Sequence, residues 1–201
     1  MIQLGRKKKA VMEKNEDGVN YLTEKYLIEL CNENEQYSTP KYNDYLYLHY
    51  KGLRKIEALD NYVNLNSLWL ENNSIRQISG ISHLEKLTML YLQHNHIERI
   101  DGISTLVNLV TLNLSFNSIT VIENLSGCTS LETLDLSNNM IIDYKDCRGL
   151  EECKSLTSVN LSENKIEYDD GLLDFFFQFQ NFIYFNFEKN PARSKIHMYR
   201  K

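Results

Sequence analysis

The sequence predicts a right-handed, curved α/β solenoid, with a parallel β-sheet on its concave face and short turns or helices on its convex face. One pattern, L-x-L-x-x-N-x-I, occurs four times, beginning at Leu68, Leu90, Leu112 and Leu134. Its asparagines are spaced 22 residues apart, at Asn73, Asn95, Asn117 and Asn139. A fixed period of about 20–29 residues on this pattern is typical of leucine-rich repeats.

Each part of the pattern has a physical role in one coil. Alternating leucines face one side of a short strand, and neighbouring coils must stack to bury them. The asparagine stands where the chain leaves the strand, and its amide can pair with backbone groups that would otherwise be buried alone. Isoleucines such as Ile97 and Ile100 close the back of the coil. We expect Leu92→Ala or Leu114→Ala to cost about 2–5 kcal/mol of stability.

Four units are expected along the chain. Residues 1–19 include the basic run Arg6–Lys9 and are interpreted as a disordered polar tail, with a nuclear signal or an anionic docking patch as alternatives. Residues 20–41 are expected to form an N-terminal capping helix with Thr23 as its N-cap. Residues 42–190 would form six to seven coils, and residues 191–201 would begin a C-terminal cap. The helix has apolar residues at helical spacing, Leu22, Tyr26, Leu27, Leu30 and Cys31.

The coils change character toward both ends. Lys51 occupies the asparagine position of the first coil, and the period lengthens after Asn139, to Asn164 and Asn190. The added residues fall at 149–155 and 171–180, where we expect helical turns on the convex side. The phenylalanine-rich segment 172–187 is expected to close the C-terminal end of the core, and an exposed interaction patch is its alternative. For the helix at 20–41, a membrane-binding or partner-binding helix is the alternative.

Composition narrows the functional classes. The 201 residues are 42% hydrophobic and 24% charged, with a net charge of -5 that does not favour nucleic acid. No apolar run approaches the roughly 18 residues that span a bilayer, and the N-terminus lacks the apolar core of a signal peptide, so we expect an intracellular protein. We expect a monomer without cofactor or metal. The cysteines lack C-x-x-C spacing and are interpreted as reduced thiols rather than disulfide or zinc ligands, at Cys31, Cys128, Cys147 and Cys153.

The concave face carries the candidate site. Side chains between and just after the two leucines of each strand point away from the core. One column reads Tyr47, Trp69 and Tyr91 and then becomes polar from Asn113 onward. The expected protein-binding residues are Tyr45, Tyr47, His49, Tyr50, Trp69, Glu71, Met89, Tyr91, His94 and Phe116.

The aromatic column favours binding of another protein. Neighbouring strands lie about 4.8 Å apart, so the three rings should adjoin. Aromatic side chains with a polar tip on a concave surface are typical of binding hot spots. The alternative is that the rings only stiffen the sheet.

Catalytic motifs are missing from the sequence. It contains no G-x-x-x-x-G-K-[ST], G-x-S-x-G or H-E-x-x-H. His94 and His96 flank Asn95 on different sides of the turn and should not converge on a metal. Asp135, Glu163 and Glu188 would lie on an open surface that does little to raise a carboxylate pKa. We therefore expect that the protein is not an enzyme. The alternative, from another functional class, is an enzyme whose active site lies on the concave face.

Several stretches resemble the leucine-rich repeat dynein axonemal assembly factor family. They cover the capping helix, the first coils and parts of later ones, at residues 21–27, 37–40, 43–52, 68–71, 112–115 and 122–126. Asn190-Pro191 and Tyr199-Arg200 are similar to the C-terminal cap of that family. Proteins of the family also have a long charged C-terminal region, which has no counterpart in these 201 residues. The I-x-x-I spacing also resembles the repeats of the regulatory subunit of protein phosphatase 1.

The resemblance implies a role in the cytoplasmic pre-assembly of dynein arms for motile cilia or flagella. It implies a cytoplasmic and ciliary or flagellar protein whose repeats bind dynein heavy or intermediate chains or co-chaperones. The alternatives are other adaptors with 22-residue repeats, namely a phosphatase 1 regulatory subunit, an axonemal dynein light chain or a spliceosomal A-prime-like protein.

Overall fold

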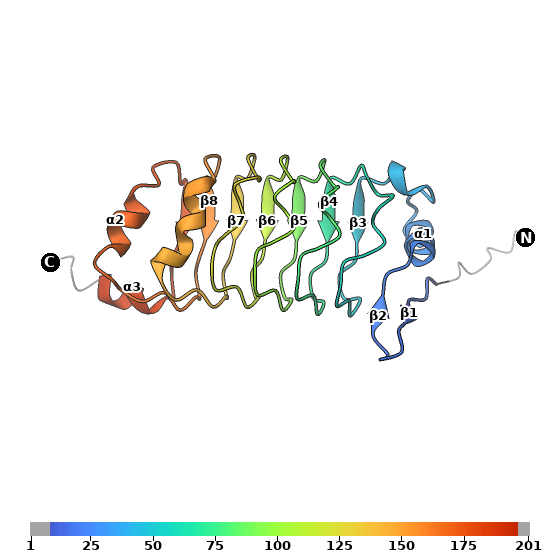
Figure 1. The fold of residues 1–201 in the computed structure, drawn as a ribbon, viewed down its shortest axis with the longest axis horizontal. Helices are drawn as coiled ribbons and strands as arrows, with labels where there is room; N and C mark the ends of the chain where they lie inside the picture. Colours follow the sequence, from blue (N-terminus) through green and yellow to red (C-terminus); the bar gives the residue numbers. More distant parts are fainter. Residues whose placement is uncertain (1–8, 197–201) are drawn as a thin grey trace, which may run out of the picture.

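Seven short parallel strands form one sheet in chain order (Figure 1). The structure is a computed structural model, and it describes residues 9–196. It confirms the predicted leucine-rich repeat solenoid, with one strand per coil. The strands are β3 (Tyr45–Tyr47), β4 (Ser67–Trp69), β5 (Met89–Tyr91), β6 (Thr111–Asn113), β7 (Thr133–Asp135), β8 (Ser158–Asn160) and β9 (Tyr184–Asn186).

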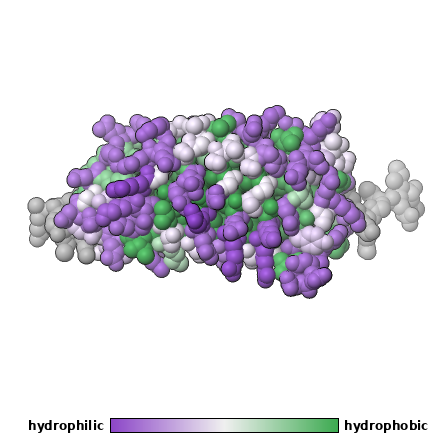
Figure 2. Space-filling model, viewed as in Figure 1, coloured by the Kyte–Doolittle hydropathy of each residue, from purple (hydrophilic) through white to green (hydrophobic). Residues whose placement is uncertain are grey.

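The register of the sheet places the repeat leucines in one buried row. Leu46 pairs with Leu68, which pairs with Leu90, and the row continues in the same register. Leu92 and Leu114 of the second row are fully buried, as are the isoleucines behind them. The coils therefore share one continuous core. On the face viewed in Figure 2, polar side chains predominate and apolar atoms are visible between them.

The repeat asparagines form a buried hydrogen-bonded ladder between coils. Oδ1 of Asn95 accepts the backbone N–H of Ile75 at 3.0 Å, while its Nδ2 donates to the carbonyls of Leu70 and Leu92, each at 3.0 Å. Each amide pairs with buried backbone groups, as the pattern predicted, and it also joins its own coil to the preceding one. The ladder consists of Asn73, Asn95, Asn117, Asn139, Asn164 and Asn190.

Helix α1 (Glu24–Glu33) covers the N-terminal end of the core. Thr23, the expected N-cap, accepts the backbone N–H of Tyr26 at 3.1 Å. The predicted apolar face is buried, and Cys31 Sγ lies 3.7 Å from the hydroxyl of Tyr62 in the first coil. A 3₁₀ helix, η1 (Pro40–Tyr42), then leads into β3.

A hairpin precedes α1. Strands β1 (Glu13–Lys14) and β2 (Asn20–Tyr21) pair antiparallel, and Oδ1 of Asn15 accepts the N–H of Val19 at 2.9 Å in the turn. Residues 13–21 are therefore folded, contrary to the disordered tail expected over residues 1–19. Contacts with the rest of the chain hold this segment: Nδ2 of Asn20 donates to the carbonyl of Lys51 in the first coil at 2.6 Å, and Met12 packs against the core. Residues Arg6–Lys8 of the basic run lie outside the described part of the chain.

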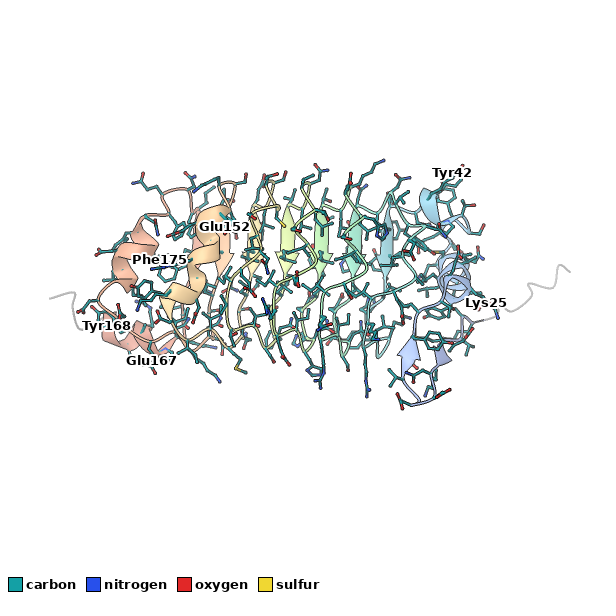
Figure 3. The ribbon with its side chains drawn as sticks, in the orientation of Figure 1. Lys25, Tyr42, Glu152, Glu167, Tyr168 and Phe175 are labelled. Carbon is teal, nitrogen blue, oxygen red and sulfur yellow. The ribbon has the colours of Figure 1, made fainter. Side chains whose placement is uncertain are left out.

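Helices occur in the two lengthened coils and just after the last coil. They are η2 (Tyr144–Glu152), a 3₁₀ helix capped by Asp143, and the α-helices α2 (Leu172–Phe177) and α3 (Pro191–Ile196). Phe175 on α2 is buried (Figure 3). Its ring centroid lies 5.5 Å from that of Tyr144. Phe177 is 75% exposed, so the phenylalanine-rich segment closes the core only in part. The expected cap pair Tyr199-Arg200 lies beyond the described residues.

Candidate functional site

Three aromatic side chains stand in one column at the N-terminal end of the concave face. Tyr47, Trp69 and Tyr91 end β3, β4 and β5 and pair in register. The ring centroids of Tyr47 and Trp69 are 4.6 Å apart, and those of Trp69 and Tyr91 are 5.5 Å apart with planes inclined by 13°. The three rings adjoin as their spacing in the sequence predicted. We call these three residues the aromatic strip.

Further rings extend the aromatic strip around β3. The centroid of Tyr45 lies 5.3 Å from that of Tyr47, and His49 lies 6.0 Å from Tyr47 and 5.8 Å from Tyr50. Tyr47 is 39% exposed and Tyr50 is 72% exposed, so these rings present apolar area to solvent. The structure thus brings the four expected residues of the first coil into one group with Trp69.

His94 and Phe116 form a second stack, just beyond the ends of β5 and β6. Their ring centroids are 4.1 Å apart and their planes are inclined by 16°. Both residues have a positive φ, 56° for His94 and 54° for Phe116, a backbone conformation that is costly for large side chains. Met89 lies beside the strip, where its Sδ accepts the hydroxyl of Tyr91 at 3.7 Å. Nine of the ten residues expected from the sequence therefore fall into two groups, and Glu71 is the tenth.

A polar column runs beside the aromatic strip, two residues after the end of each strand. It consists of His49, Glu71 and Gln93, and Nδ1 of His49 lies 3.8 Å from Oε1 of Glu71. His49 Nδ1, Glu71 Oε2 and Gln93 Oε1 are shielded from solvent, and none has a hydrogen-bond partner within residues 9–196. Gln93 was not among the residues expected from the sequence, because an isolated glutamine after a strand carries no signal of its own.

The same two columns are internally paired in the later coils. The hydroxyl of Ser115 donates to Oδ1 of Asn113 at 2.8 Å, and that of Ser137 donates to Oδ1 of Asp135 at 2.7 Å. Ser162 makes the same bond at 2.8 Å. In the first coils the concave face therefore has unpaired polar atoms beside aromatic rings. In the later coils the polar side chains of the same two columns are hydrogen-bonded to each other.

A basic groove of about 800 Å³ lies along the segments that follow the strands of the first three coils. Arg54, Lys55, Arg76 and His96 contribute its charged and titratable side chains. The sequence analysis missed this groove. Its signal was present, because Arg54 and Arg76 are one repeat of 22 residues apart.

Two of the buried cysteines have thiols whose pKa is raised. Burial raises the pKa of the Cys128 thiol to about 11 and that of the Cys153 thiol to about 12. Thiols that remain protonated at neutral pH are poor nucleophiles. Among residues 9–196, His, Cys, Asp and Glu side chains form no group of three or more that could hold a metal ion. No helix in that part of the chain is long and apolar enough to cross a membrane.

Family models match most of the coils. A model described as "Leucine rich repeat" matches residues 45–97, and one described as "Leucine Rich repeats (2 copies)" matches residues 85–127 and 107–146. A third model, also for a leucine-rich repeat, matches residues 152–173. These ranges coincide with the stacked coils of the structure.

A short segment is similar to curated dynein axonemal assembly proteins. Over 54 residues the chain is 52% identical to the dynein axonemal assembly factor 1 homolog of Drosophila melanogaster, covering 27% of this chain and 4% of that protein. Over 55 residues it is 46% identical to dynein axonemal assembly factor 1 of Mus musculus, covering 27% of this chain and 9% of that protein. The chain thus matches less than a tenth of the length of these relatives.

Solved structures share the fold over a longer stretch. An internalin from Listeria monocytogenes superposes with a TM-score of 0.57 at 23% identity, covering 84% of this chain and 51% of that one. The chain in a crystal structure of a TLR13–ssRNA13 complex superposes with a TM-score of 0.65 at 27% identity, covering 75% of this chain and 22% of that one.

Proposed function

We propose that this leucine-rich repeat protein is a non-catalytic scaffold that binds another protein through the aromatic strip, in the cytoplasmic pre-assembly of axonemal dynein arms. Its partners would be dynein heavy or intermediate chains or co-chaperones, and its location the cytoplasm and the cilium or flagellum.

The observation that carries the binding proposal is the aromatic strip itself. Trp69, the only tryptophan of the chain, stands between two tyrosines on the open inner wall of the sheet. Tryptophan and tyrosine are enriched in binding hot spots because they bury a large apolar area against the partner and still offer a polar group for hydrogen bonding. The later coils show no such group in the same column, where Asn113, Asp135 and Asn160 are hydrogen-bonded to neighbouring serines.

The dynein part of the proposal is supported by the similarity to dynein axonemal assembly factor 1 proteins. The identity of 46–52% over about 50 residues recurs in relatives from flies, mosquitoes and rodents. Because the match covers a small share of those proteins, what the rest of them does is not carried to this chain.

The test is a pull-down from ciliated cells with wild-type protein and the Trp69→Ala variant. Loss of Trp69 should weaken partner binding by about 2 kcal/mol, roughly 30-fold in Kd, while thermal stability stays near that of the wild type. Recovery of dynein chains or assembly co-chaperones with the wild type would support the proposed role. Recovery of a phosphatase or spliceosomal proteins instead would favour one of the other 22-residue-repeat adaptors.

Phe177→Ala is the matched control, because it removes an exposed ring on α2, at the other end of the molecule. It should leave binding unchanged. Full binding by a Trp69→Ala/Tyr91→Ala double variant would exclude the aromatic strip as the binding site, and loss of binding by Phe177→Ala alone would move the site to the C-terminal end.

A further inference from the structure

The polar column beside the aromatic strip holds hydrogen-bonding atoms that the protein itself does not satisfy. Oε2 of Glu71, Oε1 of Gln93 and Nδ1 of His49 are each shielded from solvent and lack a partner in the described chain. Shielded polar atoms are paired in nearly all native structures, so each exception calls for an explanation. These three atoms come from β3, β4 and β5 or the residues just after them, and therefore lie in one row across the sheet.

Other carboxylates on the same face are already paired. Asp135 accepts the hydroxyl and the backbone N–H of Ser137, and Glu163 pairs with Lys189. Glu188 pairs with Arg193 at 3.0 Å. Glu71 differs, because its closest basic group is the His49 ring at 3.8 Å, which is too far for a hydrogen bond. Its carboxylate is the one that needs a donor from outside.

The missing partner must supply donors and a positive charge. A carboxylate oxygen and an amide oxygen accept only, so Glu71 and Gln93 both need N–H or O–H groups. They follow the ends of neighbouring strands, which lie about 4.8 Å apart, a spacing that a forked donor can span. An arginine guanidinium offers five N–H donors in one plane, whereas a lysine ammonium is a compact point charge.

The aromatic strip favours the same group. The rings of Trp69 and Tyr91 are nearly parallel, inclined by 13°, and they border the polar column. A guanidinium stacks on such ring faces through its own plane and through cation–π attraction. It can therefore cover the rings while its edge points to the carboxylate.

We propose that the aromatic strip and the polar column together form a pocket for an arginine side chain of the bound protein. In it the guanidinium stacks on Trp69 and Tyr91 and donates hydrogen bonds to Glu71 Oε2 and Gln93 Oε1. This inference rests on the proposed function and specifies the chemistry that the partner presents.

The first experiment uses a small probe, because the partner is unidentified. Trp69 is the only tryptophan, so its fluorescence reports directly on this surface. The 201-residue chain is titrated with the capped tripeptide acetyl-Gly-Arg-Gly-amide and with the same peptide carrying citrulline or lysine in place of arginine. We expect a saturable change with the arginine peptide, and binding at least tenfold weaker with citrulline, which keeps the shape but loses the charge. Equal responses to arginine and citrulline would overturn the proposal.

The second experiment separates the arginine pocket from the proposed function. Glu71→Gln should weaken binding of the arginine peptide at least tenfold without lowering the melting temperature, because it removes an unpaired shielded charge. Asp135→Asn is the matched control, a carboxylate on the same face that already has protein partners, and it should leave peptide binding within twofold.

The two ideas then fail in different ways. If Trp69→Ala abolishes capture of the cellular partner while Glu71→Gln leaves both capture and peptide binding intact, the binding face stands and the arginine pocket is wrong. If neither variant alters capture but Glu71→Gln still abolishes peptide binding, the pocket stands and the assigned function of the face is wrong.

Discussion

The backbone of Gly127 lies against the carbonyl of Ser104 in the preceding coil, so closely that a Cβ at Gly127 would fall 1.7 Å from that oxygen. Real atoms do not approach to this distance, and the obstacle is backbone rather than a movable side chain. Glycine is therefore required here by the stacking distance of two coils.

Gly127→Ala should consequently destabilise the protein by about 1–3 kcal/mol or more, the usual range for overpacking. Urea unfolding followed by circular dichroism measures this. Ser126→Ala, at the exposed neighbouring position, should change stability by no more than about 0.5 kcal/mol. Equal stability of the two variants would mean that the coils can separate at little cost.

The asparagine ladder predicts a second stability effect. Asn117 is buried; its Oδ1 accepts the N–H of Ile97 at 2.9 Å, and its Nδ2 donates to the carbonyls of Leu92 and Leu114. Asn117→Ala leaves several buried backbone groups unpaired, each worth about 1–3 kcal/mol, so we expect a loss on the order of 2–4 kcal/mol. Asn108→Ala, which removes an exposed amide, should cost less than about 0.5 kcal/mol in the same unfolding assay.

The positive φ of 54° at Phe116 predicts that glycine gives a more stable protein than alanine at this position, the reverse of the usual order. Phe116→Ala and Phe116→Gly both remove the ring, but alanine strains in this conformation and glycine does not. We expect the glycine variant to be more stable by about 0.5–1 kcal/mol. At Val107, an exposed position outside the positive-φ residues, alanine should be the more stable of the two. The same order at both positions would contradict the strain.

Buried thiols predict a loss of stability in alkali. The pKa of Cys128 is raised by burial from 9.0 to about 11, so the folded state keeps a proton that the unfolded chain releases near pH 9. This contribution is complete below about pH 9 and is lost as the pH rises toward 11. Denaturant unfolding at pH 7.5 and at steps up to pH 10.5 should show the free energy of unfolding falling.

The slope of that fall should be smaller for Cys128→Ala than for the wild type. Tyr62, whose pKa is also raised by burial, contributes in the same direction, so the difference between the two proteins isolates the thiol. Parallel pH profiles would show that Cys128 does not contribute.

The solenoid could be predicted because the residues that specify each coil are close together in the sequence and recur along the chain. Leucine alternation and the asparagine at each turn recur every 22 residues, so the register of β4 to β7 and the ladder amides could be read directly. The N-terminal hairpin could not, because its contacts with the rest of the chain, such as the hydrogen bond from Asn20 to Lys51, 31 residues away, follow no repeated pattern.

The candidate site was predictable in one part only. Periodicity placed Tyr47, Trp69 and Tyr91 side by side, since all three occupy the same position of the repeat. That Glu71 and Gln93 have unpaired oxygen atoms could not be predicted, because this depends on which neighbouring groups come within hydrogen-bond distance in three dimensions. In the next coils a serine at the same position pairs with the residue two places before it, a difference visible only in the hydrogen bonds.

Each amide of the asparagine ladder belongs to two coils at once, and this determines how the molecule should come apart. Opening one interface between coils exposes apolar area and also strips hydrogen bonds from the coils on both sides of it. Such a stack behaves as a one-dimensional cooperative chain, in which a boundary between folded and unfolded coils is costly. Heating should therefore melt the seven coils joined by the six ladder amides in a single sharp transition, without populating molecules that have lost only a coil from the middle.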